Sequence, residues 1–594
     1  MNRHIFICRT INENPETTQR SLAAAMDISL GTVNRLLHEC IQAGYLSATD
    51  SGYQLTNAGR VFLEPYRVDN AIILAAGFGS RFVPLTFETP KGLLEVFGER
   101  MIERQIRQLH EVGIYDITIA VGYLKEKFEY LIDKFGVKLL YNPEYRSKNT
   151  LATLYHVRHL LKNTYLLSSD NWLRENMYHT YEPGAWYSAP YSAGKTGEWC
   201  MKADRKGRVT RIQVGGEETY YMYGSVYFDR EMSAQMVSYL EEYYNRPGTE
   251  NFYWEQILQD HVDTLCFYLN KQPDNQVYEF ENLEELRQFD PRYQNHSDNA
   301  AMECVAKVFH IKESEITHIR CLKAGMTNKS FLFEVHGKHY ICRIPGPGTE
   351  LLINRRQEKA VYDAVAPLDI TERILYFDGE TGYKVSEYYE DSRNPDNQSW
   401  EDMKICMSVI RRLHDSNLKV SHSFDIRERI AFYEGLCRGN NCLYFDDYAQ
   451  VKDQMNQLMD RLAALNPPKT LSHIDSNVDN FLFMENGDVR LIDWEYAGMC
   501  DPLIDISMTA IYSYYDADRL DKLIALYLER EPNDEERFRI YSYVALGGFL
   551  WALWAVYKES LGEEFGEYTI TMYRYAKNYY RKITKELENM LYCS

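Results

Sequence analysis

The sequence lacks the cysteine spacings of metal and redox sites, although 12 cysteines occur among its 594 residues. Cys437 and Cys442 are the nearest pair, with four residues between them. This arrangement argues against the usual cysteine-based metal and redox motifs. We therefore read the cysteines as reduced thiols of a cytoplasmic protein rather than as disulfides.

Signals for secretion or membrane insertion are also lacking. The start, Met1 to Arg9, is too short in its apolar part for a secretory signal. Only Ile540 to Tyr557 approaches transmembrane length, because it is uncharged between Arg539 and Lys558. Since this run holds two glycines, a serine and three tyrosines, we expect a buried helix and no membrane span.

Positive charge is scarce, and the formal net charge is -20 at pH 7. This balance argues against nonspecific binding to nucleic acid or anionic lipid, although a local basic site could survive inside an acidic chain. We find no internal repeat and no low-complexity tract. The length predicts three or four domains in a multidomain protein of the α/β and α+β classes.

Residues 1 to 66 predict a small winged helix-turn-helix domain. Ser21 to Met26 suits a short helix, Ile28-Ser29 a turn and cap, and Tyr53 to Gly59 the wing. The second helix would bury Leu30, Val33, Leu37, Cys40 and Ile41, and would expose Thr32, Asn34, Arg35 and His38. The exposed groups could meet phosphates or base edges in a major groove.

The charge of this domain leaves its partner open. Residues 1 to 67 contain six arginines, no lysine and six acidic residues. Attraction to DNA is therefore weak unless the arginines cluster. DNA binding is one reading, and a retained fold used for dimerisation or ligand sensing is the other. Whether the protein is an oligomer also stays open.

Residues 67 to 292 alternate apolar runs with helical segments. The runs at 71–75, 117–121, 137–141 and 165–169 predict strands, and Met101 to Val112 predicts a helix. This alternation favours a mostly parallel, doubly wound, Rossmann-like sheet with ligands at the carboxyl ends of its strands. The domain is expected to end near Arg292, where the sequence becomes polar and rich in turn residues.

The turn after the first strand has features of a nucleotide site. Gly77 and Gly79 let the backbone approach a triphosphate, whose charge the amide groups and Arg81 can meet. Lys91 follows shortly after, and Asp170 ends a later strand, where a carboxylate could hold Mg²⁺. Together these residues resemble the nucleotidyltransferases that make nucleoside-diphosphate sugars and alcohols.

The resemblance narrows to bacterial CTP:phosphocholine cytidylyltransferases over nearly all of residues 70 to 290. The segments that carry it, in order and spacing, are Gly122 to Glu126, Tyr145 to Asn149, Ser169 to Asn171, Glu198-Trp199, Tyr253 to Glu255 and Tyr278 to Glu281. It implies that CTP binds to Gly77, Gly79, Ser80, Arg81, Lys91, Asn149 and Thr150. Arg81 and Lys91 would contact its phosphates as catalytic cations.

The same resemblance implies the metal and substrate residues. Asp170 and Glu281 would share Mg²⁺, although the family has Asp where this chain has Glu281. Phosphocholine would bind Glu198, Trp199, Tyr253 and Trp254, whose aromatic faces suit a trimethylammonium group. Plain core packing is the alternative for each ring. A phosphate oxygen of phosphocholine would attack the α-phosphorus of CTP and release pyrophosphate, without a covalent enzyme intermediate.

Residues 293 to 594 contain an order of Asp, Asn and Asp that is typical of phosphoryl transfer. Asp475 and Asn480 lie in one polar segment, and Asp493 follows an apolar run. In a kinase site of this kind Asp475 accepts the proton of a substrate hydroxyl. Asn480 and Asp493 hold Mg²⁺ against the ATP phosphates. The sequence therefore predicts a bilobal, kinase-like domain.

The ATP site is expected upstream of this catalytic set. A loop at 325–330 precedes a strand, a cation stands on the next strand, and a glutamate follows in a helix, which is the kinase order. The cation is arginine, and the Asp-Phe-Gly of protein kinases is missing, so the region resembles the choline kinase and aminoglycoside phosphotransferase group. The predicted ATP residues are Thr327, Asn328, Ser330, Arg343, Glu358 and, at the hinge, Glu387.

Choline kinases are the closer match within that group, because of Gly548 to Trp554 and Trp494 to Tyr496. Trp551 and Trp554 share a helix face, so two indole rings could flank one cation. The resemblance implies choline binding by Tyr496, Trp551 and Trp554, with core packing as the alternative for each Trp. Tyr512 falls where eukaryotic choline kinases carry an acid, so choline would rely more on aromatic contacts than on charge.

The two sites together predict a bifunctional enzyme that makes CDP-choline. The C-terminal site would phosphorylate choline with ATP, and the middle site would join phosphocholine to CMP from CTP. Bacteria with this pattern use CDP-choline to decorate surface glycans and glycolipids. Two alternatives stay open: the same architecture acting on ethanolamine or another alcohol or sugar phosphate, and a transcription regulator that senses choline or a nucleotide.

Overall fold

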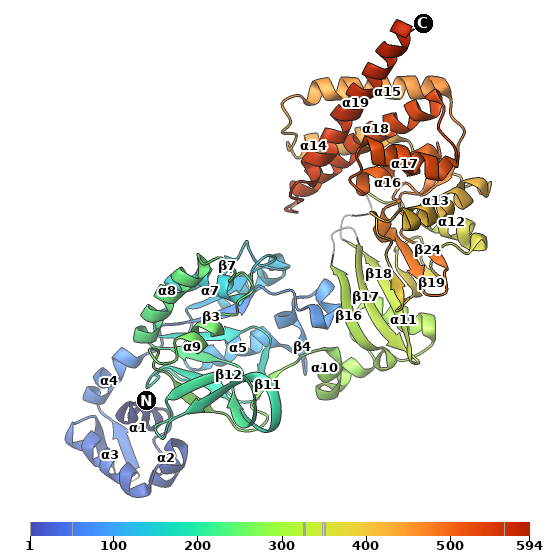
Figure 1. The fold of residues 1–594 in the computed structure, drawn as a ribbon. Helices are drawn as coiled ribbons and strands as arrows, with labels where there is room; N and C mark the ends of the chain where they lie inside the picture. Colours follow the sequence, from blue (N-terminus) through green and yellow to red (C-terminus); the bar gives the residue numbers. More distant parts are fainter. Residues whose placement is uncertain are drawn as a thin grey trace. The chain divides into compact units, whose positions relative to one another are not determined.

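The computed structural model describes residues 2–49, 52–324, 328–346, 349, 352–563 and 565–593, apart from the side chains of 323, 324 and 586–593. The chain divides into two compact units. The first comprises residues 1–303 with 312–321, and the second 304–311 with 322–594. Figure 1 shows the chain from its N-terminal helices to α19.

The first unit begins with a winged helix, as predicted. Its elements are α1 (Arg3–Glu13), α2 (Gln19–Met26), α3 (Leu30–Gln42), β1 (Leu46–Thr49), β2 (Gly52–Leu55) and α4 (Asn57–Leu63). Ser29 caps α3, because its side chain accepts a hydrogen bond from the Thr32 backbone N–H. Val33, Leu37 and Cys40 are buried, but Leu30 is 46% exposed because it is the first residue of the helix.

The winged helix is anchored to the rest of its unit by a buried charge. Arg9 on α1 donates a hydrogen bond to Glu182 at 2.9 Å, and the Tyr165 hydroxyl donates to the other oxygen of Glu182 at 2.5 Å. The Asn2 backbone N–H also donates to the Pro183 carbonyl. The arginine compensates a carboxylate that is only 2% exposed, so this contact is structural.

A seven-stranded sheet forms the centre of the first unit, in the order β14-β10-β13-β8-β3-β6-β7. The strands are β3 (Asn70–Ala75), β6 (Ile117–Val121), β7 (Lys138–Tyr141), β8 (Thr164–Ser168), β10 (Trp186–Ala189), β13 (Val226–Phe228) and β14 (Tyr268–Lys271). β3 pairs in parallel with β6 and β8, and β13 runs antiparallel to β8. The doubly wound prediction is therefore confirmed, with one antiparallel insertion.

Helices cover both faces of this sheet. They are α5 (Met101–Glu111), α6 (Tyr130–Phe135), α7 (Thr150–Val157), α8 (Arg230–Tyr244) and α9 (Glu255–Asp260), and α10 (Leu283–Phe289) follows. Ile72 of β3 belongs to the apolar cluster with α7 and α8, whereas Ile73 belongs to the cluster with α5. Strands buried on both faces need continuous apolar runs, which is why these strands were predictable.

Shorter strand pairs complete the first unit. They are β4 (Glu95–Val96) with β5 (Glu99–Arg100), β9 (Asn171–Leu173) with β15 (Val277–Glu279), and the long ribbon β11 (Tyr191–Ala203) with β12 (Val209–Tyr221). β9 begins directly after Asp170, and its antiparallel partner β15 ends at Glu279. These pairs place residues that are distant in sequence at one edge of the sheet.

The second unit has the two-part build of a kinase. The strands of its sheet are β17 (Asn328–Val335), β18 (Lys338–Pro345), β19 (Ile374–Phe377) and β20 (Lys384–Glu387), in the order β17-β18-β20-β19. β16 (Thr317–Ala324) precedes β17 in the strand order, and its residues 317–321 are counted with the first unit. The helices near this sheet are α11 (Ala300–Phe309) and α12 (Arg355–Val365). The bilobal prediction is thus confirmed.

Helices dominate the rest of the second unit. They are α13 (Trp400–Asp415), α14 (Ile426–Gly439), α15 (Tyr448–Leu465), α16 (Leu503–Tyr512), α17 (Ala517–Leu528), α18 (Asp534–Glu559) and α19 (Tyr568–Cys593). Short strands carry the catalytic segments: β21 (Ser392–Arg393), β22 (Thr470–Ser472), β23 (Phe481–Met484), β24 (Val489–Leu491) and β25 (Gly498–Cys500). α14, α15, α16 and α19 all contact α18.

The long apolar run predicted as a buried helix lies in α18. By length and composition this helix could cross a membrane, but 89% of its apolar window is buried inside the protein. Apolar residues cover it on all sides, which is typical of a central helix in a large core. α18 therefore supports the helices packed around it and carries Trp551 and Trp554.

Candidate functional sites

One cleft of about 770 Å³ in the first unit gathers every residue predicted for the middle site. It lies at the carboxyl ends of β3 and β8, where ligands of open α/β sheets bind. The predicted residues that line it are Gly77, Gly79, Ser80, Arg81, Lys91, Asn149, Thr150, Asp170, Glu198, Trp199, Tyr253, Trp254 and Glu281. Their roles in substrate binding stay predictions.

The glycine-rich turn is shaped for a close approach. Gly79 has a positive φ of 67°, a conformation that favours glycine. A side chain there would meet Lys91 and Thr86 at 3.1 and 3.2 Å. Because Gly79 has no side chain, a ligand can approach the backbone of this turn beside the ammonium group of Lys91.

Lys91 and Asp170 form the polar centre of the cleft. Lys91 donates a hydrogen bond to Asp170 at 2.6 Å, and Ser168 donates to the other carboxylate oxygen at 2.5 Å. Burial alone would raise the pKa of Asp170, but Lys91 and Ser168 outweigh it and hold that pKa below its ordinary value. Asp170 is therefore an ionised carboxylate, as a Mg²⁺ ligand must be.

Glu279 is a candidate that the sequence analysis did not select. It stands opposite Asn171 in the pairing of β15 with β9 and accepts a hydrogen bond from Asn171 at 3.2 Å. Burial and the charge of Asp170 raise the pKa of Glu279 to about 7. Two neighbouring carboxylates repel each other when both are ionised, and a divalent cation bound between them would relieve this repulsion.

Glu281, the predicted second metal ligand, lies beyond the end of β15. It forms an ion pair with Arg81. Asp170 and Glu279 therefore form one carboxylate pair, and Glu281 pairs with a predicted phosphate-binding cation. Among the described residues no group of three or more metal-binding side chains occurs, and Mg²⁺ is commonly held by one or two carboxylates together with substrate phosphates. The residues present fit that mode.

The aromatic end of the cleft mixes packed and open rings. Trp254 is 4% exposed and stacks on Tyr187, with ring centres 6.0 Å apart. Tyr253 is 51% exposed, and Trp199 is half-buried. Trp254 therefore both packs in the core and lines the cleft, so the two readings of that ring are compatible.

The catalytic segment of the second unit places Asp475 beside Asn480. The Asn480 amide donates hydrogen bonds to the backbone carbonyl of Asp475 at 2.8 Å and to its carboxylate at 3.0 Å. One carboxylate oxygen of Asp493, Oδ1, is buried without a hydrogen-bond partner. An orphaned carboxylate oxygen of this kind fits a metal ligand.

Asp505 braces the loop that carries Asp475. It accepts hydrogen bonds from the backbone N–H groups of His473 and Ile474, at 2.8 and 2.7 Å, and lies 3.0 Å from Nε2 of His414. Ile474 has a φ of 72°, which is strained for a β-branched residue. The buried carboxylate of Asp505 therefore holds a strained backbone directly before Asp475.

A buried charge network surrounds the predicted ATP residues. Arg343 pairs with Glu358 at 2.5 Å and lies 3.8 Å from Asp493. Burial would raise the pKa of Glu358, but the charge of Arg343 lowers it to about 2. This pair has the kinase arrangement, in which the acid fixes the phosphate-binding cation.

The other predicted ATP residues that the structure describes lie on β17 and β20 and have different neighbours. Asn328 donates a hydrogen bond to Glu495 at 2.9 Å, and Ser330 faces Arg343 across β17 and β18. Glu387 ends β20 with its carboxylate 3.3 Å from Arg373. Thr327 lies outside the described residues, and the ATP roles of all these residues stay predictions.

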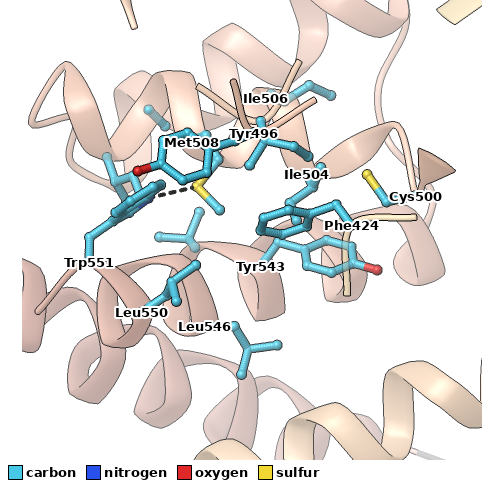
Figure 2. Close-up of a cluster of buried hydrophobic side chains, with 14 of the residues drawn as sticks. Phe424, Tyr496, Cys500, Ile504, Ile506, Met508, Tyr543, Leu546, Leu550 and Trp551 are labelled. Carbon is cyan, nitrogen blue, oxygen red and sulfur yellow. Dashed lines mark hydrogen bonds between the residues drawn. The ribbon is translucent and has the colours of Figure 1, made fainter. Parts of the chain in front are cut away.

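Trp551 is 4% exposed and lies in a buried cluster of aromatic rings, so it packs in the core, and its contact with choline stays a prediction. Its ring centre lies 5.5 Å from Tyr496, 5.8 Å from Tyr512 and 6.1 Å from Trp554. Figure 2 shows Tyr496 and Trp551 beside Met508, to which the indole N–H donates at 3.3 Å. Burial raises the pKa of Tyr512 well above its ordinary value, and the negative charge of Asp475 raises it further. Asp475, the predicted base, therefore lies near these rings.

Three family models match the chain. Residues 7–47 match winged helix-turn-helix DNA-binding domains, residues 70–274 the nucleotidyl transferases and residues 318–541 the phosphotransferase enzyme family. A choline-phosphate cytidylyltransferase of Streptococcus pneumoniae is 34% identical over 225 residues, which is 38% of this chain and 98% of that protein.

Two further relatives extend this picture. A 2-aminoethylphosphonate cytidylyltransferase of Lancefieldella rimae is 33% identical over 231 residues, covering 38% of this chain and 93% of that protein. The crystal structure of choline kinase LicA from Streptococcus pneumoniae is 29% identical, covers 47% of this chain and 97% of that chain, and has a TM-score of 0.41.

Proposed function

Because this chain belongs to the nucleotidyl transferase family over residues 70–274 and to the phosphotransferase enzyme family over residues 318–541, behind a winged helix-turn-helix domain, we propose that it makes CDP-choline. Residues 293–594 phosphorylate choline with ATP. Residues 67–292 then transfer CMP from CTP to phosphocholine and release pyrophosphate. Both steps use nucleotides of the cytoplasm, where we place the protein.

The observation that carries this proposal is the pairing of aromatic rings with phosphate- and metal-binding groups in one cleft of the first unit. In the first unit Trp199, Tyr253 and Trp254 line the same cleft as Lys91 and Asp170. Aromatic faces attract quaternary ammonium groups, and the cations and carboxylates suit Mg²⁺ and phosphates. A cleft with aromatic rings at one end and phosphate-binding groups at the other suits a phosphate ester of a cationic alcohol.

The chemistry of the middle cleft is positioning and charge neutralisation. Arg81 and Lys91 hold the CTP phosphates, and the bare backbone around Gly77 and Gly79 lies against them. Asp170, Glu279 and Glu281 are the carboxylates that would hold Mg²⁺, which when bound neutralises charge on the triphosphate. The aromatic rings orient phosphocholine so that a phosphate oxygen faces the α-phosphorus of CTP. Its attack breaks the bond to pyrophosphate, which leaves.

The chemistry of the second unit begins with choline in an aromatic cage formed by Tyr496, Trp551 and Trp554. These rings hold the ammonium group of choline, and Asp475 takes the proton of its hydroxyl. The alkoxide oxygen attacks the γ-phosphorus of ATP, and ADP leaves. Arg343 meets the nucleotide phosphates, and Asn480 and Asp493 hold Mg²⁺, which when bound offsets their charge.

A single experiment tests both steps. The purified protein receives choline, ATP, CTP and Mg²⁺, and mass spectrometry identifies the products. We expect phosphocholine, ADP, CDP-choline and pyrophosphate. Formation of neither phosphocholine nor CDP-choline, in protein with a cooperative melting transition, would refute the proposal.

A second candidate function is the same pair of reactions on a primary amine. The relative that is named for 2-aminoethylphosphonate favours it, because that substrate carries an unmethylated ammonium group. Competition among choline, ethanolamine and sugar alcohols in the ATP-consumption assay separates the two candidates. A role as a choline or nucleotide sensor would instead show binding without turnover. The final acceptor of the phosphocholine group, a surface glycan or glycolipid, is part of the proposal.

A further inference from the structure

The cleft of the first unit has an unbalanced charge. Its lining contains two cations, Arg81 and Lys91, but five carboxylates, which are Asp170, Glu198, Glu255, Glu279 and Glu281. Arg81 pairs with Glu281, and Lys91 pairs with Asp170. Glu198 and Glu255, next to Trp199 and Trp254 in the sequence, form no ion pair with either cation of the lining. A ligand with a positive charge would be favoured beside them.

Glu279, Glu198 and Glu255 differ in their neighbours and in their exposure to solvent, and therefore in how strongly each attracts a cationic ligand. Glu279 lies next to Asp170, where a divalent cation fits. Glu198 is exposed to solvent, so water screens its charge. Glu255, the first residue of α9, is partly buried, and its Oε2 atom is shielded from water, so its charge attracts an opposite charge more strongly.

Glu255 is tied to the aromatic wall but incompletely satisfied. The Tyr187 hydroxyl donates a hydrogen bond to one carboxylate oxygen at 3.4 Å, and Tyr187 in turn stacks on Trp254. The other oxygen, Oε2, is buried without a hydrogen-bond partner. Burial raises the pKa of Glu255 to about 7. A buried carboxylate with an unsatisfied oxygen is stabilised by a nearby cation.

We propose that Glu255 is the counter-charge for the ammonium group of the alcohol phosphate, and that it makes this cleft selective for cationic substrates over neutral ones of the same shape. The proposal rests on the proposed function of the cleft and adds the residue that sets its substrate class. The rings of Trp199, Tyr253 and Trp254 define the shape of the subsite. Glu255 supplies the negative charge that distinguishes a cationic ligand from a neutral ligand of the same shape.

A neutral isostere separates charge from shape. In 3,3-dimethylbutyl phosphate a carbon replaces the nitrogen of phosphocholine, so size and contour are kept and the positive charge is lost. The KM for phosphocholine and the inhibition constant of the isostere are measured for cytidylyl transfer by the full chain and by Glu255→Gln. Glutamine keeps the side-chain shape and can still accept the hydrogen bond from Tyr187.

We expect Glu255→Gln to raise the KM for phosphocholine roughly 10- to 100-fold, because a buried charge pair is lost. The inhibition constant of the isostere should change less than about threefold, since its group carries no charge for Glu255 to meet. The control Glu242→Gln removes an exposed carboxylate on α8 and should leave both constants unchanged.

The outcomes are distinct. Equal weakening of both ligands, or no change in the KM for phosphocholine, overturns the role of Glu255, because a structural residue would affect both ligands alike. Failure of the unmodified protein to convert phosphocholine and CTP to CDP-choline refutes the proposed function instead. A cooperative melting transition measured on the same preparation reports that the first unit is folded.

Discussion

A single buried carboxylate, Asp505, holds the loop before Asp475 in the second unit. Asp505 is fully buried, and it accepts hydrogen bonds from the two backbone N–H groups that precede Asp475. Because Ile474, which supplies one of these N–H groups, is in the left-handed region with φ at 72°, the loop would relax without this acceptor. The position of Asp475 thus depends on Asp505, a residue outside the predicted substrate contacts.

Replacing Asp505 by Asn should lower phosphoryl transfer roughly 10- to 100-fold, because an amide cannot accept from both N–H groups and from His414 as a carboxylate does. The loss should appear in kcat, with the KM for choline little changed, since the aromatic cage is untouched. Steady-state kinetics of ADP formation measure it. Cytidylyl transfer from supplied phosphocholine should stay at the level of the unmodified protein, and a loss there would indicate general unfolding.

Glu255 should also make the stability of the first unit depend on pH. Its pKa is about 7 in the folded protein, against an ordinary 4.5, so folding binds a proton between these values. The stabilisation is complete below the ordinary pKa and is lost as the pH rises through 7. Glu255→Gln does not titrate, so its free energy of unfolding should exceed that of the unmodified protein by up to about 3 kcal/mol above pH 8.

Denaturation followed by tryptophan fluorescence at about pH 5 and about pH 8, without substrates, measures this difference. It should be small at the lower pH and larger at the higher pH. Glu242→Gln serves as the control for removing one negative charge. The same difference at both pH values would contradict a raised pKa for Glu255.

The position of Glu279 shows what the sequence could not predict at the residue scale. Glu281 stays the predicted second metal ligand, whereas the position of Glu279 near Asp170 follows from strand pairing. That pairing joins β15 to β9, more than a hundred residues earlier, and places Glu279 opposite Asn171. No local pattern carries this register, because it depends on contacts between distant segments.

At the scale of elements, α18 and α19 meet at a point where only glycine fits. A side chain at Gly548 would lie 2.6 Å from the Met572 carbonyl oxygen and 2.7 Å from the Cβ of Tyr575. The helices can therefore approach closely one turn before Trp551. The position relative to α19 of Trp551 and Trp554, the predicted choline-binding residues of α18, depends on this close approach.

Gly548→Ala should destabilise the second unit by about 1–3 kcal/mol, because the helices must separate or shift. It should also raise the KM for choline more than the KM for ATP, since the displaced helix carries the aromatic cage. The control is Gly435→Ala on α14, where an added methyl group meets nothing within 4 Å; that change should be neutral or slightly stabilising. Urea denaturation and kinase kinetics of both variants decide the point.

Elements differed in how far the sequence predicted them. β3, β6 and β8 were found because continuous apolar runs are needed where a strand is buried on both faces. β7 is an edge strand that is only partly buried, and it was found from the apolar residues Leu139 and Leu140. The ribbon of β11 and β12 was not predicted, because most of its residues are exposed and only Cys200 and Met201 of β11 are buried. α4 was missed because Tyr53 to Gly59 was assigned to the wing, whereas β2 ends at Leu55 and Thr56 caps a helix.

At the scale of the whole molecule, the two chemistries should be separable by substitution. Asp475→Ala should reduce phosphocholine formation roughly 10²- to 10⁴-fold, because the general base is lost, and leave cytidylyl transfer from supplied phosphocholine intact. Asp170→Ala should do the reverse, with a loss of roughly a thousandfold. The exposed neighbour Asp479→Ala is the matched control for the catalytic loop.

Mixing the two variants extends this test. If phosphocholine diffuses freely between sites, a mixture of Asp475→Ala and Asp170→Ala should make CDP-choline from choline, ATP and CTP. Dilution of the labelled product by unlabelled phosphocholine measures the same exchange in the unmodified protein. Loss of both activities in either variant, without unfolding, would contradict two independent sites.

The contact of Arg9 with Glu182 and Tyr165 has a consequence for how such a chain can be shortened. A protein starting at residue 67 would keep Glu182 but lose the guanidinium that neutralises it, inside the scaffold that supports β8. Such a trimmed enzyme needs a compensating change at position 182 to recover its solubility and yield. Related proteins that lack the winged helix should therefore have a neutral side chain at the position equivalent to Glu182.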